Sequence, residues 1–88
     1  MRIDVALHRL CLTKSRTEAK DACESGAIDV NGSKAKPSLD VAVGDTVTLR
    51  FATRLLEIRL IELPPKSTSR KAAREMYEAL RDERAGDS

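Results

Sequence analysis

The chain lacks any apolar run long enough to span a bilayer. Its first residues also lack the basic-then-apolar pattern of a secretory signal peptide. We therefore expect a cytoplasmic protein with no membrane contact. No internal repeat is present, and 88 residues are enough for one small domain with a modest core.

Residues that commonly carry chemistry are scarce. Aromatic side chains are limited to Phe51 and Tyr77, and His8 is the only histidine. No acid or nucleophile is spaced to partner His8, so it is interpreted as a solvated surface residue. Cys11 and Cys23 are the only cysteines, and both fall on the apolar stripes of expected helices. Free core thiols are therefore expected, without a metal site. No cofactor, catalytic residue or small-molecule substrate is expected either, so the chain is not expected to be an enzyme.

Charge of one sign is not in large excess. Sixteen basic and fourteen acidic residues leave a formal net charge of +2. This value is too small for an argument from overall electrostatics, so any nucleic-acid signal must come from where the charges lie.

The strongest helix signal begins at Ser15. Ser15 and Glu18 have capping-box spacing, in which the hydroxyl accepts from the backbone N–H of Glu18 and the carboxylate accepts from the N–H of Ser15. A helix is therefore predicted to begin at Arg16. Gly26 stands where a residue in the left-handed conformation would end it.

The first turn of this helix is cationic. Arg16 and Lys20 share one helix face, and Lys14 lies in the loop just before them. Guanidinium and ammonium groups beside free backbone N–H donors suit phosphate oxygens. Taken alone, the same pattern is also typical of an ordinary solvated helix face.

An earlier helix is predicted over residues 5 to about 12, with Asp4 as its N-cap. Leu7, Leu10 and Cys11 form its buried stripe, and Ile3 packs at its start. The link over residues 13–14 is short, so the two helices should form a compact pair.

The periodicity changes to that of strands after Gly26. Asn31-Gly32 is the strongest hairpin signal of the chain, because both residues tolerate positive φ. The returning strand over residues 33–36 places Lys34 and Lys36 on one face, and Pro37 interrupts pairing. Further strands are predicted over residues 46–51 and 55–63, with a bulge or the strand end near residue 61.

The C-terminal part is predicted to be a linker followed by a helix. Pro64 ends the last strand, and residues 66–69 are typical of a linker. A helix over about residues 70–84 would pack on the sheet through Ala73, Met76, Tyr77 and Leu80, and the end from Ala85 onward is expected to be frayed. The predicted organisation is therefore residues 1–63 as one domain and residues 64–88 as linker and packed helix.

The ordered set of motifs resembles the S4 RNA-binding domain. The motifs are Arg2-Ile3-Asp4, Ser15-Arg16-Thr17-Glu18-Ala19, Gly26, Val30-Asn31-Gly32, Lys36-Pro37-Ser38 and Val43-Gly44-Asp45. The tail over residues 72–80 is similar to that of the small stand-alone members, which are the RqcP-like factors and their relative, the fifteen-kilodalton heat-shock protein. The resemblance implies an α+β fold, with two N-terminal helices on a small, mostly antiparallel sheet plus a C-terminal helix.

The resemblance also implies a function and a site. RqcP-like factors bind the large ribosomal subunit, through rRNA and peptidyl-tRNA, in quality control of stalled translation, and a monomer is expected. Carried over by position, the RNA-binding residues are Arg2, Lys14, Ser15, Arg16, Thr17, Lys20, Lys34 and Lys36. Val5 and Cys11 stand where the family pattern is often basic, which makes this face less cationic.

Three other functions remain open at this point. The chain could be an accessory interaction module for an RNA-modifying enzyme, or a general binder of structured RNA or tRNA. A DNA-binding helix-turn-helix fits less well, because strand periodicity follows the second helix directly and no recognition helix with base-reading Asn or Gln is offered.

Overall fold

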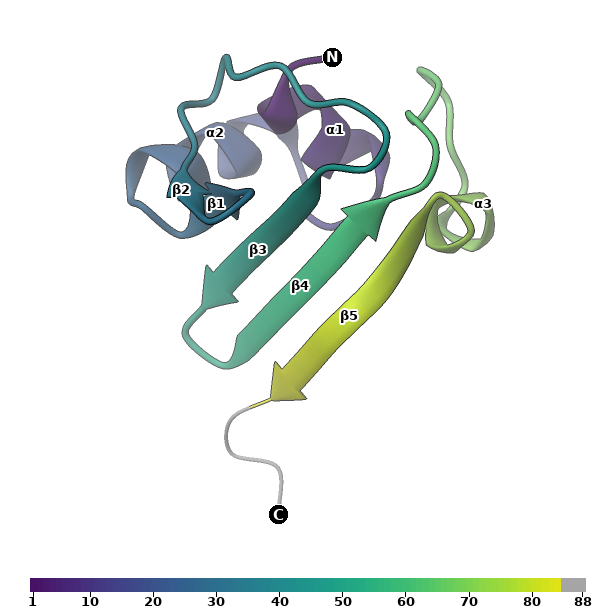
Figure 1. Cartoon of the computed structure of the whole chain (residues 1–88). Helices are drawn as coiled ribbons and strands as arrows, with labels where there is room; N and C mark the ends of the chain where they lie inside the picture. The colour runs from purple at the N-terminus through teal and green to yellow at the C-terminus, as the bar shows by residue number, and fades with distance from the viewer. Residues whose placement is uncertain (85–88) are drawn as a thin grey trace.

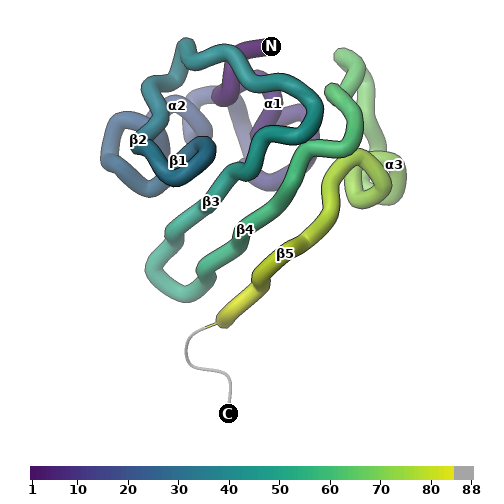
Figure 2. The backbone as a smooth tube through the Cα atoms, viewed as in Figure 1, coloured from purple at the N-terminus to yellow at the C-terminus, as the bar shows by residue number. Residues whose placement is uncertain are grey.

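The computed structural model describes residues 1–84, which form an α+β fold. Five strands make one antiparallel sheet in the order β2-β1-β3-β4-β5. Along the chain the elements are α1 (Ile3–Arg9), α2 (Arg16–Glu24), β1 (Ile28–Val30), β2 (Ser33–Lys34), β3 (Thr46–Phe51), β4 (Arg54–Leu60), α3 (Arg70–Arg74) and β5 (Tyr77–Arg84). Figures 1 and 2 show α1 and α2 together behind one end of the sheet, while the long strands β3, β4 and β5 extend beyond them.

The core lies between the helix pair and one face of the sheet. Val47 and Leu49 of β3 and Leu56, Ile58 and Leu60 of β4 are buried, as the alternation of the sequence predicts. They pack against Ile3, Ala6 and Leu7 of α1, Leu10 at its C-cap and Ala19 of α2. Each large apolar side chain buried in this way contributes about 1.5–3 kcal/mol to folding.

The first helix begins two residues earlier than predicted, so the assignment of Asp4 as its N-cap is wrong. The N-cap is Arg2, which makes no side-chain capping bond, and Asp4 lies inside the first turn and is buried. The chain after β2 satisfies the free N–H groups instead: Ile3 N–H donates to the Leu39 carbonyl (2.8 Å) and Asp4 N–H to the Pro37 carbonyl (3.3 Å). Burial of Ile3 fixes this earlier start.

Cys11 is not on a buried helical stripe. Helix α1 ends at Arg9, and Cys11 takes a left-handed conformation (φ +59°) in the loop that follows. Its side chain is exposed, whereas Cys23 is buried as expected, and both thiols are free. The core position predicted for Cys11 is therefore wrong, because the helix ends before its stripe reaches that residue.

The hairpin turn at Asn31-Gly32 is confirmed. The two residues have φ values of +52° and +84°, and they join β1 to β2. The Asn31 side chain does more than tolerate the turn, since its oxygen accepts from the Thr46 N–H (2.9 Å) and its amide donates to Asp45 (3.2 Å). These bonds attach the hairpin to the start of β3.

The returning strand is shorter than predicted. β2 ends at Lys34, so Lys36 is not on a strand face, although both lysines are exposed. β4 ends at Leu60, in agreement with a strand end near residue 61. A register shift does occur in this region, but it lies between Glu57 and Ile58 where β4 pairs with β5.

The predicted extent of the C-terminal helix is wrong. Helix α3 covers only Arg70–Arg74, and residues 77–84 form β5 along the edge of β4. A bare β4 would expose a row of unpaired backbone groups, and β5 pairs with this edge on both sides of the register shift. Cross-strand ion pairs, Arg54 with Asp82 and Arg59 with Glu78, support the same pairing. This tertiary pairing outweighs the helical propensity of Ala, Leu, Glu and Arg.

The predicted division of the chain after residue 63 stays a prediction. The fraying expected from Ala85 onward concerns residues that lie outside the described part.

Candidate nucleic-acid interface

The start of α2 is built largely as its capping box predicts. Ser15 is the N-cap, and its hydroxyl accepts from the Glu18 N–H (3.0 Å). The Glu18 carboxylate reaches back one residue further than expected and accepts from the Lys14 N–H (3.3 Å). Lys14, Ser15, Arg16 and Thr17 are all exposed, so the whole helix entry is accessible. Gly26 has φ +82° and ends the helix region as predicted.

A buried carboxylate joins the two arginines of the predicted site. Asp4 has a side chain that is only 2% exposed. Its oxygens accept from Arg2 in a fork, from Nε at 3.2 Å and from Nη2 at 3.1 Å. Arg16 Nε lies 3.6 Å from the same carboxylate, and the Val5 backbone N–H donates to it at 2.8 Å. We call Arg2, Asp4 and Arg16 the arginine clamp.

The arginine clamp presents cationic groups with restricted freedom. The side chains of Arg2 and Arg16 remain 45% and 55% exposed, so solvent or a ligand can reach them. Two guanidinium groups share one carboxylate, which leaves one net positive charge at the junction of α1 and α2. Ordering an arginine before it meets a ligand lowers the entropic cost of binding. Guanidinium groups are suited to bidentate contacts with phosphate oxygens.

Charges along α2 restrict the cationic surface to part of the helix. Arg16 and Lys20 are exposed and lie one turn apart, as predicted. The helix also carries the exposed carboxylates of Glu18, Asp21 and Glu24, so it has more acidic than basic side chains. The positive groups therefore gather at the helix start, beside Arg2 and Lys14.

Lys34 and Lys36 lie at the other end of α2. They line one groove together with the helix end and Gly26, and a Cβ added at Gly26 would come 3.5 Å from Lys34 Nζ. The two lysines therefore share a groove although they do not share a strand. The structure thus brings Arg2 and Arg16 into direct connection and places Lys34 and Lys36 beside the last turn of the helix.

Asp4 is the site residue whose role sequence reasoning missed. The sequence pattern predicts a helix cap at Asp4, yet its carboxylate accepts from Arg2 and pairs with Arg16. One signal was present in the sequence, since Asp4 is the only acidic residue before Glu18 and stands two residues after Arg2. That position does not reveal that Arg16 comes within reach, because only the packing of α1 against α2 decides it.

The described residues contain no metal-binding group. No cluster of three or more His, Cys, Asp or Glu side chains among residues 1–84 is placed to hold a metal ion.

Burial raises the pKa of the Cys23 thiol to about 11, with further contributions from the charges of Asp4 and Glu24. None of the helices within residues 1–84 is long and apolar enough to cross a membrane.

Comparison with known proteins assigns the chain to a class of proteins. Residues 1–47 match the family model of the S4 domain, which covers α1, α2, the β1–β2 hairpin and the start of β3. The solved trimeric structure of Heat Shock Protein 15 from Vibrio cholerae has the same fold, with a TM-score of 0.84 and 28% identity over 90% of this chain and 80% of that chain. The fold and this match define an S4-domain protein.

Whole-length relatives then narrow the class. The RQC P-site tRNA stabilizing factor of Bacillus subtilis is 39% identical over 99% of this chain and 100% of its own length. Its counterpart in Streptococcus pneumoniae is 38% identical over 100% of this chain and 99% of its own length. The chain belongs to the family of RQC P-site tRNA stabilizing factors. The family name describes a tRNA-stabilizing factor and not an enzyme.

Proposed function

We propose that this protein is an RNA-binding factor that associates with the large ribosomal subunit and stabilises peptidyl-tRNA in the quality control of stalled translation. The observation that carries the proposal is the arginine clamp, set in a chain that aligns from end to end with factors named for stabilising P-site tRNA. It works in the cytoplasm, as a monomer, through binding alone.

The arginine clamp supplies the affinity in this proposal. Arg2 and Arg16 bind phosphate oxygens of one RNA region. Neighbouring contacts come from residues around the start of α2, which are Lys14, Ser15, Thr17 and Lys20. Lys34 and Lys36 extend the contact to the far end of the helix. Because Asp4 holds Arg2 by two hydrogen bonds and lies 3.6 Å from Arg16, part of the side-chain freedom is already lost before the RNA binds.

Fractionation of a lysate that contains tagged protein tests the proposal. We expect the protein to sediment with free large ribosomal subunits, and Arg16→Ala to release it. Arg16→Lys should restore only part of the binding, because an ammonium cannot make a bidentate contact. Arg59→Ala is the matched control, since Arg59 is similarly exposed at 52% but pairs with Glu78 across the β4–β5 edge of the sheet.

Two outcomes would reject the proposal. Co-sedimentation with an RNA-modifying enzyme in place of the subunit would favour an accessory module. Binding to any structured RNA with equal affinity, without enrichment on large subunits, would favour a general RNA binder. If the protein binds RNA in either way, its affinity should fall steeply with salt. The slope of the logarithm of the binding constant against the logarithm of the salt concentration should be about −0.7 to −0.9 for each phosphate contact.

A further inference from the structure

A second group of basic side chains lies outside the residues assigned to the S4 surface. Arg54 at the start of β4, Arg70 and Arg74 on α3, and Arg84 at the end of β5 line one cavity, together with Tyr77 and the loop after α1. All four charged side chains that line it are arginines. We call this group the arginine pocket.

Strand pairing concentrates positive charge there. Arg54 and Arg84 are direct partners across β4 and β5, an arrangement in which like charges repel. Asp82 offsets part of the charge, because its carboxylate accepts from Arg54 Nε and Nη2, both at 3.0 Å. That contact lowers the pKa of Asp82.

The helix α3 adds two arginines that the fold leaves available. Among residues 1–84, neither Arg70 nor Arg74 forms a salt bridge, and both are exposed. The pocket therefore has an excess of positive charge that the described residues do not balance. The like charges gathered from three separate elements repel one another, and a polyanion would relieve the repulsion.

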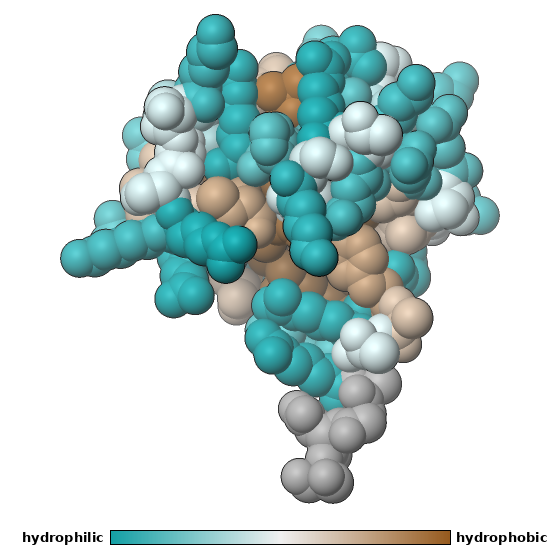
Figure 3. Space-filling model, turned by 180° about the vertical axis from the view of Figure 1, so that it is seen from behind, coloured by the Kyte–Doolittle hydropathy of each residue, from teal (hydrophilic) through white to brown (hydrophobic). Residues whose placement is uncertain are grey.

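The arginine pocket is continuous with the start of α2. A neighbouring depression shares Cys11, Leu12, Arg54 and Arg70 with the pocket and extends to Lys14 and Glu18. Leu12 and Phe51 line the depression. The face of the molecule seen in Figure 3 has apolar atoms at its middle, framed by hydrophilic side chains. One elongated ligand can therefore lie along both surfaces.

We propose that the arginine pocket is a second phosphate-binding surface, which holds another segment of the backbone of the RNA bound at the arginine clamp. The proposal rests on the RNA-binding function proposed above and extends it to α3 and β5. An RNA backbone fits better than a single small anion, because the basic groups continue along the depression to Lys14 instead of closing around one point. Arginine is also the side chain best suited to contact phosphates in pairs.

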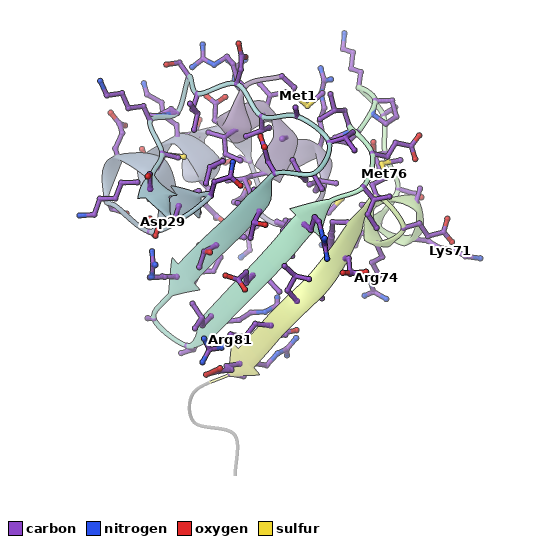
Figure 4. All side chains as sticks on the ribbon, viewed as in Figure 1. Met1, Asp29, Lys71, Arg74, Met76 and Arg81 are labelled. Carbon is purple, nitrogen blue, oxygen red and sulfur yellow. The ribbon has the colours of Figure 1, made fainter. Side chains whose placement is uncertain are left out.

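The test compares Arg70→Gln/Arg74→Gln with Lys66→Gln/Lys71→Gln. The control removes the same charge from the same part of the chain, but neither lysine lines the arginine pocket or the depression. Figure 4 shows the Lys71 side chain extending outward from α3, away from the sheet. Both variants are first compared with the parent by thermal melting, and then by binding of fluorescent tRNA across a salt series and by sedimentation with large subunits.

We expect the arginine variant alone to bind tRNA more weakly, and its log–log salt slope to be smaller by about 1.4–1.8, as for two lost phosphate contacts. An unchanged slope, or an equal loss in the lysine control, would overturn the proposal. Addition of pyrophosphate to the parent protein separates the two sources of phosphate. If NMR signals of Arg70 and Arg74 shift on this addition while the arginine variant binds tRNA with unchanged affinity, the pocket is a small-anion site and the proposal is wrong. Loss of subunit binding in Arg16→Ala, with none in the arginine variant, would reject this inference and keep the proposed function. Absence of RNA binding by the parent protein would reject both.

Discussion

The Asp4 carboxylate lies 3.6 Å from Arg16 Nε and connects the first turn of α1 to the first turn of α2. An arginine at the start of a helix stands near the positive end of the helix dipole, which opposes its charge. Asp4 compensates for that disadvantage from the neighbouring helix. Arg16 can therefore be held at the protein surface without an external anion, while 55% of its side chain remains exposed.

Asp4→Asn tests whether arrangement or charge governs binding at the arginine clamp. The substitution makes the protein more positive by one unit, so simple electrostatics predicts tighter binding to RNA. We expect weaker binding, because Arg2 and Arg16 lose the carboxylate that orders them. Fluorescence anisotropy with labelled tRNA checks this, and Glu62→Gln gives the same charge change at an exposed position outside both the arginine clamp and the groove of Lys34 and Lys36. Tighter binding in Asp4→Asn would contradict the ordering role.

The same substitution should lower stability. Asp4 is buried and accepts from Arg2 and from the Val5 N–H, and an amide cannot replace all of these contacts. The expected loss in free energy of unfolding is on the order of 1–3 kcal/mol. The measurement is a denaturant titration of Asp4→Asn and of its charge control. A midpoint equal to that of the parent would mean that the contact of Asp4 with Arg2 contributes no net stability.

Gly32→Val tests the hairpin turn. Gly32 has φ +84°, and a Cβ there would meet nothing within 4 Å, so the cost comes from backbone strain and not from a clash. We expect a loss of about 1–2 kcal/mol and a lower melting temperature. Ser33→Val, at an exposed strand position next to the turn, serves as the control. RNA binding at a temperature where both variants are folded should be unchanged.

Acid stability should depend on the pair formed by Asp29 and Arg50 across β1 and β3. Arg50 Nη2 donates to the Asp29 carboxylate at 2.7 Å, and this contact lowers the pKa of Asp29. A carboxyl group with a lower pKa in the folded state stabilises the fold above its unfolded pKa of about 4, and loses this contribution as the pH falls further. Arg50→Gln should therefore flatten the fall in melting temperature below about pH 5.

Lys71→Gln is the charge-matched control for that measurement, because Lys71 forms no ion pair among residues 1–84. Its acid profile should run parallel to that of the parent. An unchanged slope in Arg50→Gln would show that Asp29 is not a source of the acid sensitivity.

The two thiols should react very differently in the folded protein. Cys11 is exposed in the loop after α1, whereas Cys23 is 5% exposed and burial raises its pKa to about 11. Because the thiolate is the reactive form, we expect rapid alkylation of Cys11 alone at about pH 8. Mass spectrometry of the native protein should find one modified site, and denaturation should expose the second. Equal rates for both cysteines in the native protein would contradict the packing of α2.

Local signals in the sequence were enough for the parts of the fold that depend on few residues. The cap at Ser15, the turn at Asn31-Gly32 and the alternation along β3 each follow from the chemistry of neighbouring residues, and the structure confirms all three. The order of these motifs also carried the family resemblance. For the same reason the positions of Arg16 and Lys20 on α2, and of Lys14 just before it, could be predicted.

Tertiary structure decided what depends on residues far apart in the chain. Residues 77–84 carry a helical pattern of propensities, yet they form a strand because the edge of β4 offers them backbone partners. Asp4 is not the cap of its helix, because Leu39 and Pro37 accept the N–H groups of Ile3 and Asp4 and the helix begins two residues earlier. The joining of Arg2 to Arg16 through a buried carboxylate, and the gathering of Arg54, Arg70, Arg74 and Arg84 around one cavity, arise only when separate elements pack together.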